Sequence, residues 1–146
     1  ADECGEELSG LQIFRAFEEE YLHCEGPFAF ETFHVEDIAE QDGAKVVTCT
    51  ARISVDGIVR ELRGRGNGPI DAFVQALNQG DVAEFKVLSY AEHALEQGAG
   101  AQAIAYIQIQ TSSDITCFGA ATDTNIELAA VKAVLCALNR SQRYRG

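Results

Sequence analysis

A glycine-rich turn that opens a helix occurs twice in this chain, and this repetition constrains the fold more than any other feature. The first copy runs from Arg65 to Ala72 (RGNGPIDA) and the second from Phe118 to Ile126 (FGAATDTNI). Their first glycines, Gly66 and Gly119, are 53 residues apart, and each copy follows strand-like segments. Two helix N-termini on glycine turns form two similar pockets that can hold a small anion. The pattern therefore favours ligand sensing over catalysis.

Hydrophobic periodicity predicts the elements around these turns. The first half is predicted to hold a helix over residues 9–22, strands over 28–38, 47–55 and 58–64, and a helix that Pro69 starts and residues 78–80 close. The second half is predicted to hold strands over 82–90, 103–109 and 115–118 and a helix over 126–138. Turns are expected at 41–43, 56–57, 97–100 and 112–114, and a β-bulge near residues 31–32. Thr124 and Glu127 predict a capping box for the last helix.

Three strands and a helix, occurring twice, favour an α+β fold. We expect an N-terminal linker helix followed by two βββα repeats with pseudo-twofold symmetry, with the helices packed on antiparallel sheet. Residues 1–25 then form an acidic N-terminal segment and linker helix, and residues 26–146 form the main domain. Its first repeat covers about 28–80 and its second about 82–141.

The charge of the chain excludes several classes of partner. The net charge is −12 for 146 residues, so nucleic acid and anionic membranes are expected to be repelled. Neither a run of 18 apolar residues nor a basic-then-apolar leader is present, which favours a cytoplasmic protein. Five cysteines at spacings unlike those of metal sites are expected to be free thiols in a reducing compartment.

Catalytic and metal-binding alternatives have little support in the sequence. His93 follows Glu92, but neighbouring residues of a strand point to opposite faces, so a metal site is not expected. A hydrolase that uses Cys49 or Cys117 lacks a nucleophile motif around either residue. Asp71 could equally be a partner of the helix dipole, Tyr90 a core residue and Asn125 a helix cap.

Three ordered motifs resemble the C-terminal regulatory domain of 2-isopropylmalate synthase. The first is the glycine-rich stretch 64–73; the second is Tyr90–Ala94, followed by Gly98 and residues 101–103; the third is the stretch 119–130. Residues 138–140 resemble the end of that domain, so the resemblance covers roughly residues 28–140. Residues 11–22 also resemble the tail of the linker subdomain that precedes it.

The resemblance implies feedback regulation by L-leucine. In that family the regulatory domain binds leucine near the interface of two such domains. The resemblance therefore implies a homodimer. The parent enzyme condenses acetyl-CoA with 2-oxoisovalerate in a metal-dependent catalytic barrel, so this chain is expected to be non-catalytic and to hold no cofactor or metal of its own. The alternatives are the isoleucine-binding domain of citramalate synthase and a dimerisation module without ligand, with homocitrate synthase a further relative. The element Tyr90–Ala94 favours the isopropylmalate enzymes.

A leucine site needs groups for a carboxylate, an ammonium and a branched side chain. Backbone N–H groups of Asn67–Gly68 and Ile70–Asp71 suit the carboxylate, with Pro69 starting the helix and Gly66 and Gly68 allowing close approach. Asp71 or a free carbonyl suits the ammonium. The resemblance implies an apolar pocket made of Ile70, Val87, Tyr90, Ala94 and Ala101. The second turn supplies Gly119, Ala121, Asp123, Asn125 and Ile126, where Ala121 departs from the family's Gly-x-Gly and predicts a narrower second pocket.

Overall fold

The computed structural model describes residues 26–94 and 102–143. The predicted helix over 9–22, the loop at 97–100 and Ala101 lie outside these residues. The first half contains β1 (Phe28–Gln41), β2 (Ala44–Val55), β3 (Ile58–Gly66) and α2 (Pro69–Gln79). The second half contains β4 (Phe85–Ala94), β5 (Ala103–Thr111), β6 (Thr116–Asp123) and α3 (Ile126–Arg143). The expected α+β class is therefore confirmed.

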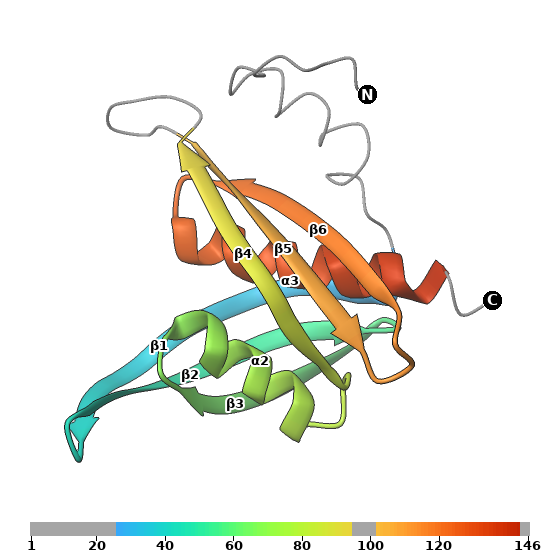
Figure 1. Cartoon of the computed structure of the whole chain (residues 1–146). Helices are drawn as coiled ribbons and strands as arrows, with labels where there is room; N and C mark the ends of the chain where they lie inside the picture. The colour runs from blue at the N-terminus through green and yellow to red at the C-terminus, as the bar shows by residue number, and fades with distance from the viewer. Residues whose placement is uncertain (1–25, 95–101, 144–146) are drawn as a thin grey trace.

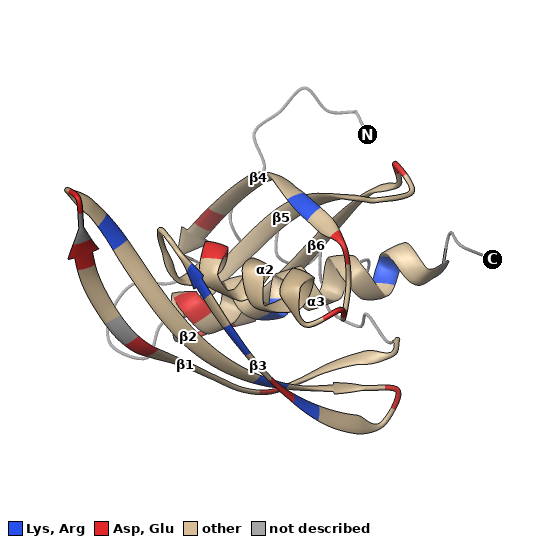
Figure 2. Cartoon of the chain, turned by 90° about the horizontal axis from the view of Figure 1, so that it is seen from below, with Lys and Arg blue, Asp and Glu red and all other residues tan. Residues whose placement is uncertain are grey.

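Two antiparallel sheets enclose the helices. One sheet has the order β1-β2-β3 and the other β4-β5-β6, and α2 and α3 lie between them (Figures 1 and 2). The prediction of helices on antiparallel sheet is right, but the six described strands form two separate sheets on opposite sides of the helix layer. The core consists of the inward faces of both sheets and the apolar stripes of both helices. Among the described residues, neither helix is both long and apolar enough to span a membrane.

Local sequence signals fix the first sheet. In β2 every second residue from Val47 to Ile53 is fully buried, as the strict alternation predicts. Asp42–Gly43 and Asp56–Gly57 both have positive φ, the geometry of the tight two-residue turn that suits a twisted hairpin. The bulge predicted near residues 31–32 is present between Phe30 and Thr32, and a second one, which was not predicted, follows Val35.

The strand expected over 82–90 begins later, at Phe85. The backbone N–H groups of Val82 and Ala83 donate to Leu77 O at 3.1 and 3.3 Å, so these residues wrap the end of α2. The strand then starts where the Asn78 side chain accepts the Phe85 N–H at 3.1 Å. Apolar content alone could not distinguish this helix-closing turn from a strand.

The second glycine turn predicted from the sequence is wrong. Gly119, Ala120 and Ala121 lie inside β6, where Gly119 pairs with Ile107 and Ala121 with Ala105. A Cβ on Gly119 would lie 2.5 Å from Ala137 N, so the absent side chain lets α3 approach the sheet. Its counterpart in the first half is Gly64, where a Cβ would lie 2.6 Å from Ala76 N of α2. The two copies therefore match as Gly64 and Gly119, rather than as Gly66 and Gly119.

An asparagine near the end of each helix fastens the first residue of an edge strand. Asn139 of α3, which is 4% exposed, accepts the Phe28 N–H at 2.9 Å and donates to Phe28 O at 2.8 Å. Asn78 of α2 makes the corresponding bond to Phe85 N. Phe28 and Phe85 are both 8% exposed. The α3 helix therefore holds the start of β1, the first of the described strands.

The cysteines differ in state. Cys49 and Cys117 are free and buried, whereas Cys136 is disulfide-bonded. The expectation of free thiols throughout is therefore wrong for Cys136. Burial raises the pKa of the Cys49 thiol to about 11 and also raises the pKa of Cys117. Both thiols stay protonated near neutral pH, which disfavours the hydrolase alternative.

Candidate functional site

A cavity of about 640 Å³ lies between the beginning of α2 and the inward side of β4. Its size falls within the range of small-molecule sites, roughly 300–1,000 Å³. The loop before α2, one face of that helix from Pro69 to Asn78, and the part of β4 from Phe85 to Tyr90 form its walls. The lining residues are Asn67, Gly68, Pro69, Ile70, Asp71, Val74, Gln75, Asn78, Phe85, Lys86, Val87 and Tyr90.

The beginning of α2 offers free backbone donors to this cavity. The N-cap is Gly68, in an extended conformation with φ −168°, so no side chain caps the helix. Pro69 is the first helical residue and has no N–H, and Ala72 N already donates to Gly68 O at 2.9 Å. The N–H groups of Ile70 and Asp71 lie in the first turn, where helix geometry provides no carbonyl partner. Together with the helix dipole they make a site for a carboxylate.

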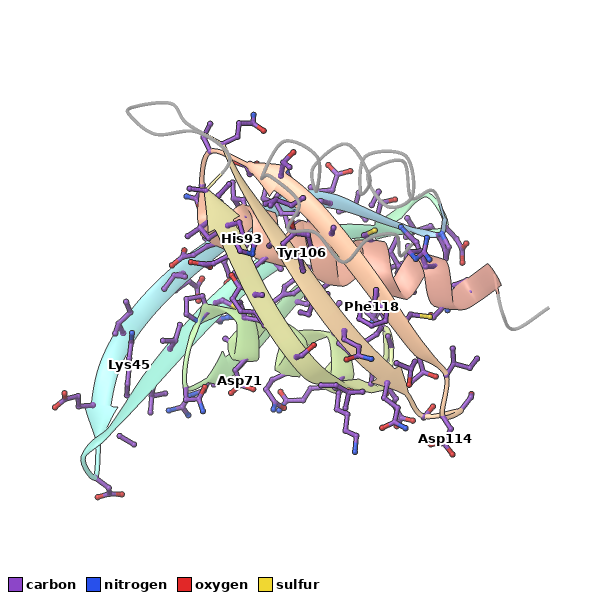
Figure 3. The ribbon with its side chains drawn as sticks, turned by 45° about the horizontal axis from the view of Figure 1, so that its top comes forward. Lys45, Asp71, His93, Tyr106, Asp114 and Phe118 are labelled. Carbon is purple, nitrogen blue, oxygen red and sulfur yellow. The ribbon has the colours of Figure 1, made fainter. Side chains whose placement is uncertain are left out.

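The Asp71 side chain braces the loop that leads into the helix. Its Oδ2 atom accepts the Asn67 N–H at 3.0 Å (Figure 3 labels Asp71). Gly66, the last residue of β3, is close enough that a Cβ there would lie 2.7 Å from Ala72 N. The structure thus gives Asp71 a structural task in the loop and gives Gly66 a reason to lack a side chain.

The β4 wall brings Val87 and Tyr90 opposite the helix start. Val87 is half-buried, and Tyr90 remains 37% exposed at the cavity mouth. The Tyr90 hydroxyl donates to Glu92 Oε2 at 2.5 Å. Burial raises the pKa of Tyr90 well above its ordinary value, and the hydrogen bond to the Glu92 carboxylate raises it further, so the phenol stays a donor. Glu92 is a residue that the sequence reasoning missed, although its position two residues after Tyr90 on a strand predicts a shared face.

Two predicted pocket residues are not among those that line the cavity. Ala94 is the exposed last residue of β4, and Ala101 lies outside the described residues. His93 points to the other face of the sheet, where its ring packs edge-on against Tyr106 at 5.7 Å between centroids (Figure 3). Residues 26–94 and 102–143 contain no group of three or more His, Cys, Asp or Glu side chains that could hold a metal ion.

The beginning of α3 differs from that of α2 because it is capped. Asn125 Oδ1 accepts the backbone N–H groups of Glu127 at 2.8 Å and Leu128 at 3.1 Å. The predicted capping box is therefore wrong: Asn125, and not Thr124, caps the helix, as the alternative interpretation of Asn125 held, and Leu128 rather than Glu127 lies three residues after the cap. Ile126 is the first residue of α3.

Asp123 completes the closed start of α3. Its side chain accepts the Asn125 N–H at 2.9 Å and pairs with Lys132 Nζ at 2.8 Å. Burial raises the pKa of Asp123, but these two partners outweigh it and hold the pKa below its ordinary value. Lys132 also lies 5.3 Å from the centroid of the Phe30 ring. A groove of about 350 Å³ lies further along α3, between this helix, the beginning of β1 and part of β6, and Ala121 and Lys132 help to line it.

Replacing Asn125 by alanine is expected to lower the free energy of unfolding by about 1 kcal/mol, because two first-turn N–H groups lose their acceptor. Equilibrium urea denaturation would measure the change. The matched variant Thr124→Ala should stay within about 0.5 kcal/mol of the unmodified chain. A larger loss of stability in Thr124→Ala than in Asn125→Ala would show that Thr124 caps the helix.

Comparison with known proteins finds one matching family and several similar proteins. Residues 7–142 match the family described as LeuA allosteric (dimerisation) domain. The 2-isopropylmalate synthase of Clostridium acetobutylicum is 41% identical over 143 residues, which are 97% of this chain and 25% of the relative. That of Azoarcus sp. is 41% identical over 145 residues, 99% of this chain and 24% of the relative. That of Rhodospirillum rubrum is 35% identical over 138 residues, 94% of this chain and 24% of the relative.

The chain thus spans about a quarter of the length of the curated relatives it matches. The family match, by contrast, covers nearly all of the chain, from before the first described strand to the last turn of α3. The chain belongs to the family of LeuA allosteric (dimerisation) domains.

Proposed function

We propose that this chain is the feedback-regulatory domain of a 2-isopropylmalate synthase and that the cavity at the start of α2 binds L-leucine. The observation that carries the proposal is an uncapped helix N-terminus that opens into a cavity with an apolar wall. The leucine carboxylate binds the N–H groups of Ile70 and Asp71. The isobutyl group packs against Ile70, Val74 and Val87 on the two walls.

The same end of the molecule is the proposed dimer interface. Both helices begin at this end, and the β1–β2 hairpin projects from it (Figure 1). Tyr90 at the cavity mouth and Ile38 on the hairpin are 37% and 60% exposed. A second chain that covers these apolar side chains closes the cavity over its ligand. Leucine then acts by its higher affinity for one arrangement of the dimer, which the catalytic barrel of the longer enzyme senses.

Three correspondences support a pseudo-twofold relation between the two halves. Each helix asparagine holds the first residue of an edge strand, as Asn78 and Asn139 do. Each edge strand has a register shift shortly after its start, following Phe30 and Val87. Gly64 and Gly119 correspond as well. The departure at Ala121, from which a narrower second pocket was predicted, is the replacement of a residue inside β6, so it lends no support to a module without ligand.

Isothermal titration of the chain with leucine, isoleucine, valine and lysine tests the proposal. Leucine is expected to bind near one equivalent per chain. A preference for isoleucine would move the assignment to citramalate synthase, and a preference for lysine to homocitrate synthase. A folded dimer that gives heat with none of them would contradict the leucine site.

Replacing Gly68 by valine is expected to weaken leucine binding by about thirtyfold or more, because a branched side chain would stand where the carboxylate approaches the backbone. Folding should be unaffected, since a Cβ on Gly68 meets nothing within 4 Å and its φ suits any residue. Circular dichroism and urea denaturation would check the fold beside the titration. Unchanged leucine affinity in a folded variant would contradict the carboxylate site.

A further inference from the structure

The proposed leucine site leaves the ammonium group without an assigned partner. Among the described residues that line the cavity, Asp71 is the only acidic one, and its Oδ2 atom already accepts the Asn67 N–H. The nearby cation, Lys86, would repel an ammonium. A second carboxylate within reach of the α2 N-terminus would give the ammonium a partner that is not already engaged in holding the loop.

The geometry of β4 brings a second carboxylate to the cavity mouth. Tyr90 pairs with Ile107 and Glu92 with Ala105, and both partners are buried toward the helices. Tyr90 and Glu92 therefore face the helix layer, and the hydrogen bond between them at 2.5 Å shows that they meet. The Glu92 side chain is otherwise exposed, so one face of its carboxylate is open to a ligand.

The direction of β4 places this carboxylate beyond the start of α2. Phe85, at the beginning of β4, is tied to Asn78 near the end of the helix, whereas Tyr90 lines the cavity together with Asn67 and Gly68. The strand thus runs back along the helix, and Glu92 comes after Tyr90 in that direction. A ligand seated here has the positive end of α2 on one side and the Glu92 carboxylate on the other.

We propose that Glu92, oriented by the Tyr90 hydroxyl, binds the ammonium of the ligand and so selects an α-amino acid over its 2-oxo, 2-hydroxy and deamino analogues. This inference rests on the proposed leucine site. An α-amino acid carries its carboxylate and ammonium on one carbon, which matches a positive and a negative partner across one small cavity. The selection is useful in a regulatory domain because the 2-oxo acids of branched side chains share the carboxylate and the apolar group of the amino acid. Only the ammonium distinguishes them.

The test uses the 146-residue chain and two ligands, leucine and 4-methylpentanoate, which lacks the ammonium. Glu92→Gln is expected to weaken leucine binding by about tenfold to a hundredfold, because one charge-assisted hydrogen bond is lost. The affinity for 4-methylpentanoate should stay the same or rise, so that the preference for leucine collapses. Tyr90→Phe keeps the ring and should cause a smaller loss of the same kind. The matched control is Glu61→Gln, which removes an exposed carboxylate opposite Arg52 on the other sheet.

Each outcome of the titrations is decisive. Equal weakening of both ligands in Glu92→Gln, or unchanged leucine affinity, would overturn the role of Glu92 while leaving the leucine site intact. Absence of leucine binding in the unmodified folded chain would overturn the leucine site, and the role of Glu92 with it. A loss in Glu61→Gln as large as that in Glu92→Gln would assign the effect to net charge, which also overturns the inference.

Discussion

Replacing Phe73 by alanine is expected to lower the free energy of unfolding by about 4 kcal/mol, the largest effect of any change considered in this chain. Phe73 is fully buried on α2, and its ring packs edge-on against that of Phe33 in β1, with 5.8 Å between centroids. The substitution removes the contacts that the buried ring makes and leaves a cavity between α2 and the first sheet. It also removes the favourable edge-to-face geometry of the pair.

Equilibrium urea denaturation, followed by far-ultraviolet circular dichroism, measures this loss as a lower midpoint at unchanged slope. Phe118→Ala is the matched control, because the same atoms are removed from a side chain that is 48% exposed. Its cost should stay below about 1 kcal/mol. Equal costs for the two variants would show that α2 does not pack on the first sheet through Phe73.

Replacing Gly119 by alanine is expected to lower the free energy of unfolding by about 3 kcal/mol, at the upper end of overpacking effects. The added Cβ would lie 2.5 Å from Ala137 N and 2.9 Å from Ala137 Cα. These are main-chain atoms of α3, which cannot rotate away as the end of a side chain can. The helix would have to move from the sheet, and its Ala-rich face would lose packing along several turns.

Thermal unfolding would show this change as a fall of roughly 6–12 °C, given the usual scaling for a chain of this size. Gly68→Ala is the matched control, since its Cβ has open space around it. The pair also separates the two roles considered for Gly119. A residue of a ligand-binding turn would lose binding and keep stability, whereas a packing residue loses stability. A stable Gly119→Ala variant would contradict the close approach of α3.

The hairpins and the inward face of β2 could be predicted from the sequence because short-range chemistry determines them. Asp42–Gly43 and Asp56–Gly57 tolerate positive φ at both positions, as the hairpin turn requires. The strict alternation of residues around Cys49 requires only that one face of the strand is buried and the other is exposed to solvent. The start of α2 followed in the same way from Pro69. Each of these signals lies within a few residues of the structure it specifies.

The role of Gly119 could not be predicted from the sequence, because it depends on a tertiary contact between β6 and α3. A glycine before a helix suits a turn, but it equally suits a strand beneath a helix that approaches closely. The difference depends on Ala133 and Ala137, which lie on another element. The predicted boundaries of β6 were wrong for that reason, and so was the placement of Gly119 and Ala121 in a second turn.

The candidate site was predictable where the motif was continuous. Seven predicted residues line one cavity, namely Asn67, Gly68, Pro69, Ile70, Asp71, Val87 and Tyr90. Their binding of leucine stays a prediction. The cap of α3 could not be assigned, because Thr124 and Asn125 are both suitable capping residues and the sequence does not specify which side chain turns toward the helix. Glu92 was missed because strand alternation places it on the same face as Tyr90 but does not specify that this face turns toward the helices and the cavity.

The bond between Asn139 and Phe28 has a consequence for how the chain reaches its native state. The two residues are 111 positions apart, so their contact closes a loop that spans most of the chain. Long-range closures of this kind raise contact order and slow folding. During synthesis the first sheet emerges well before α3. Its edge strand β1 therefore lacks the hydrogen bonds to Asn139 until α3 has been made. The two halves are therefore expected to mature together, as one cooperative unit, rather than one after the other.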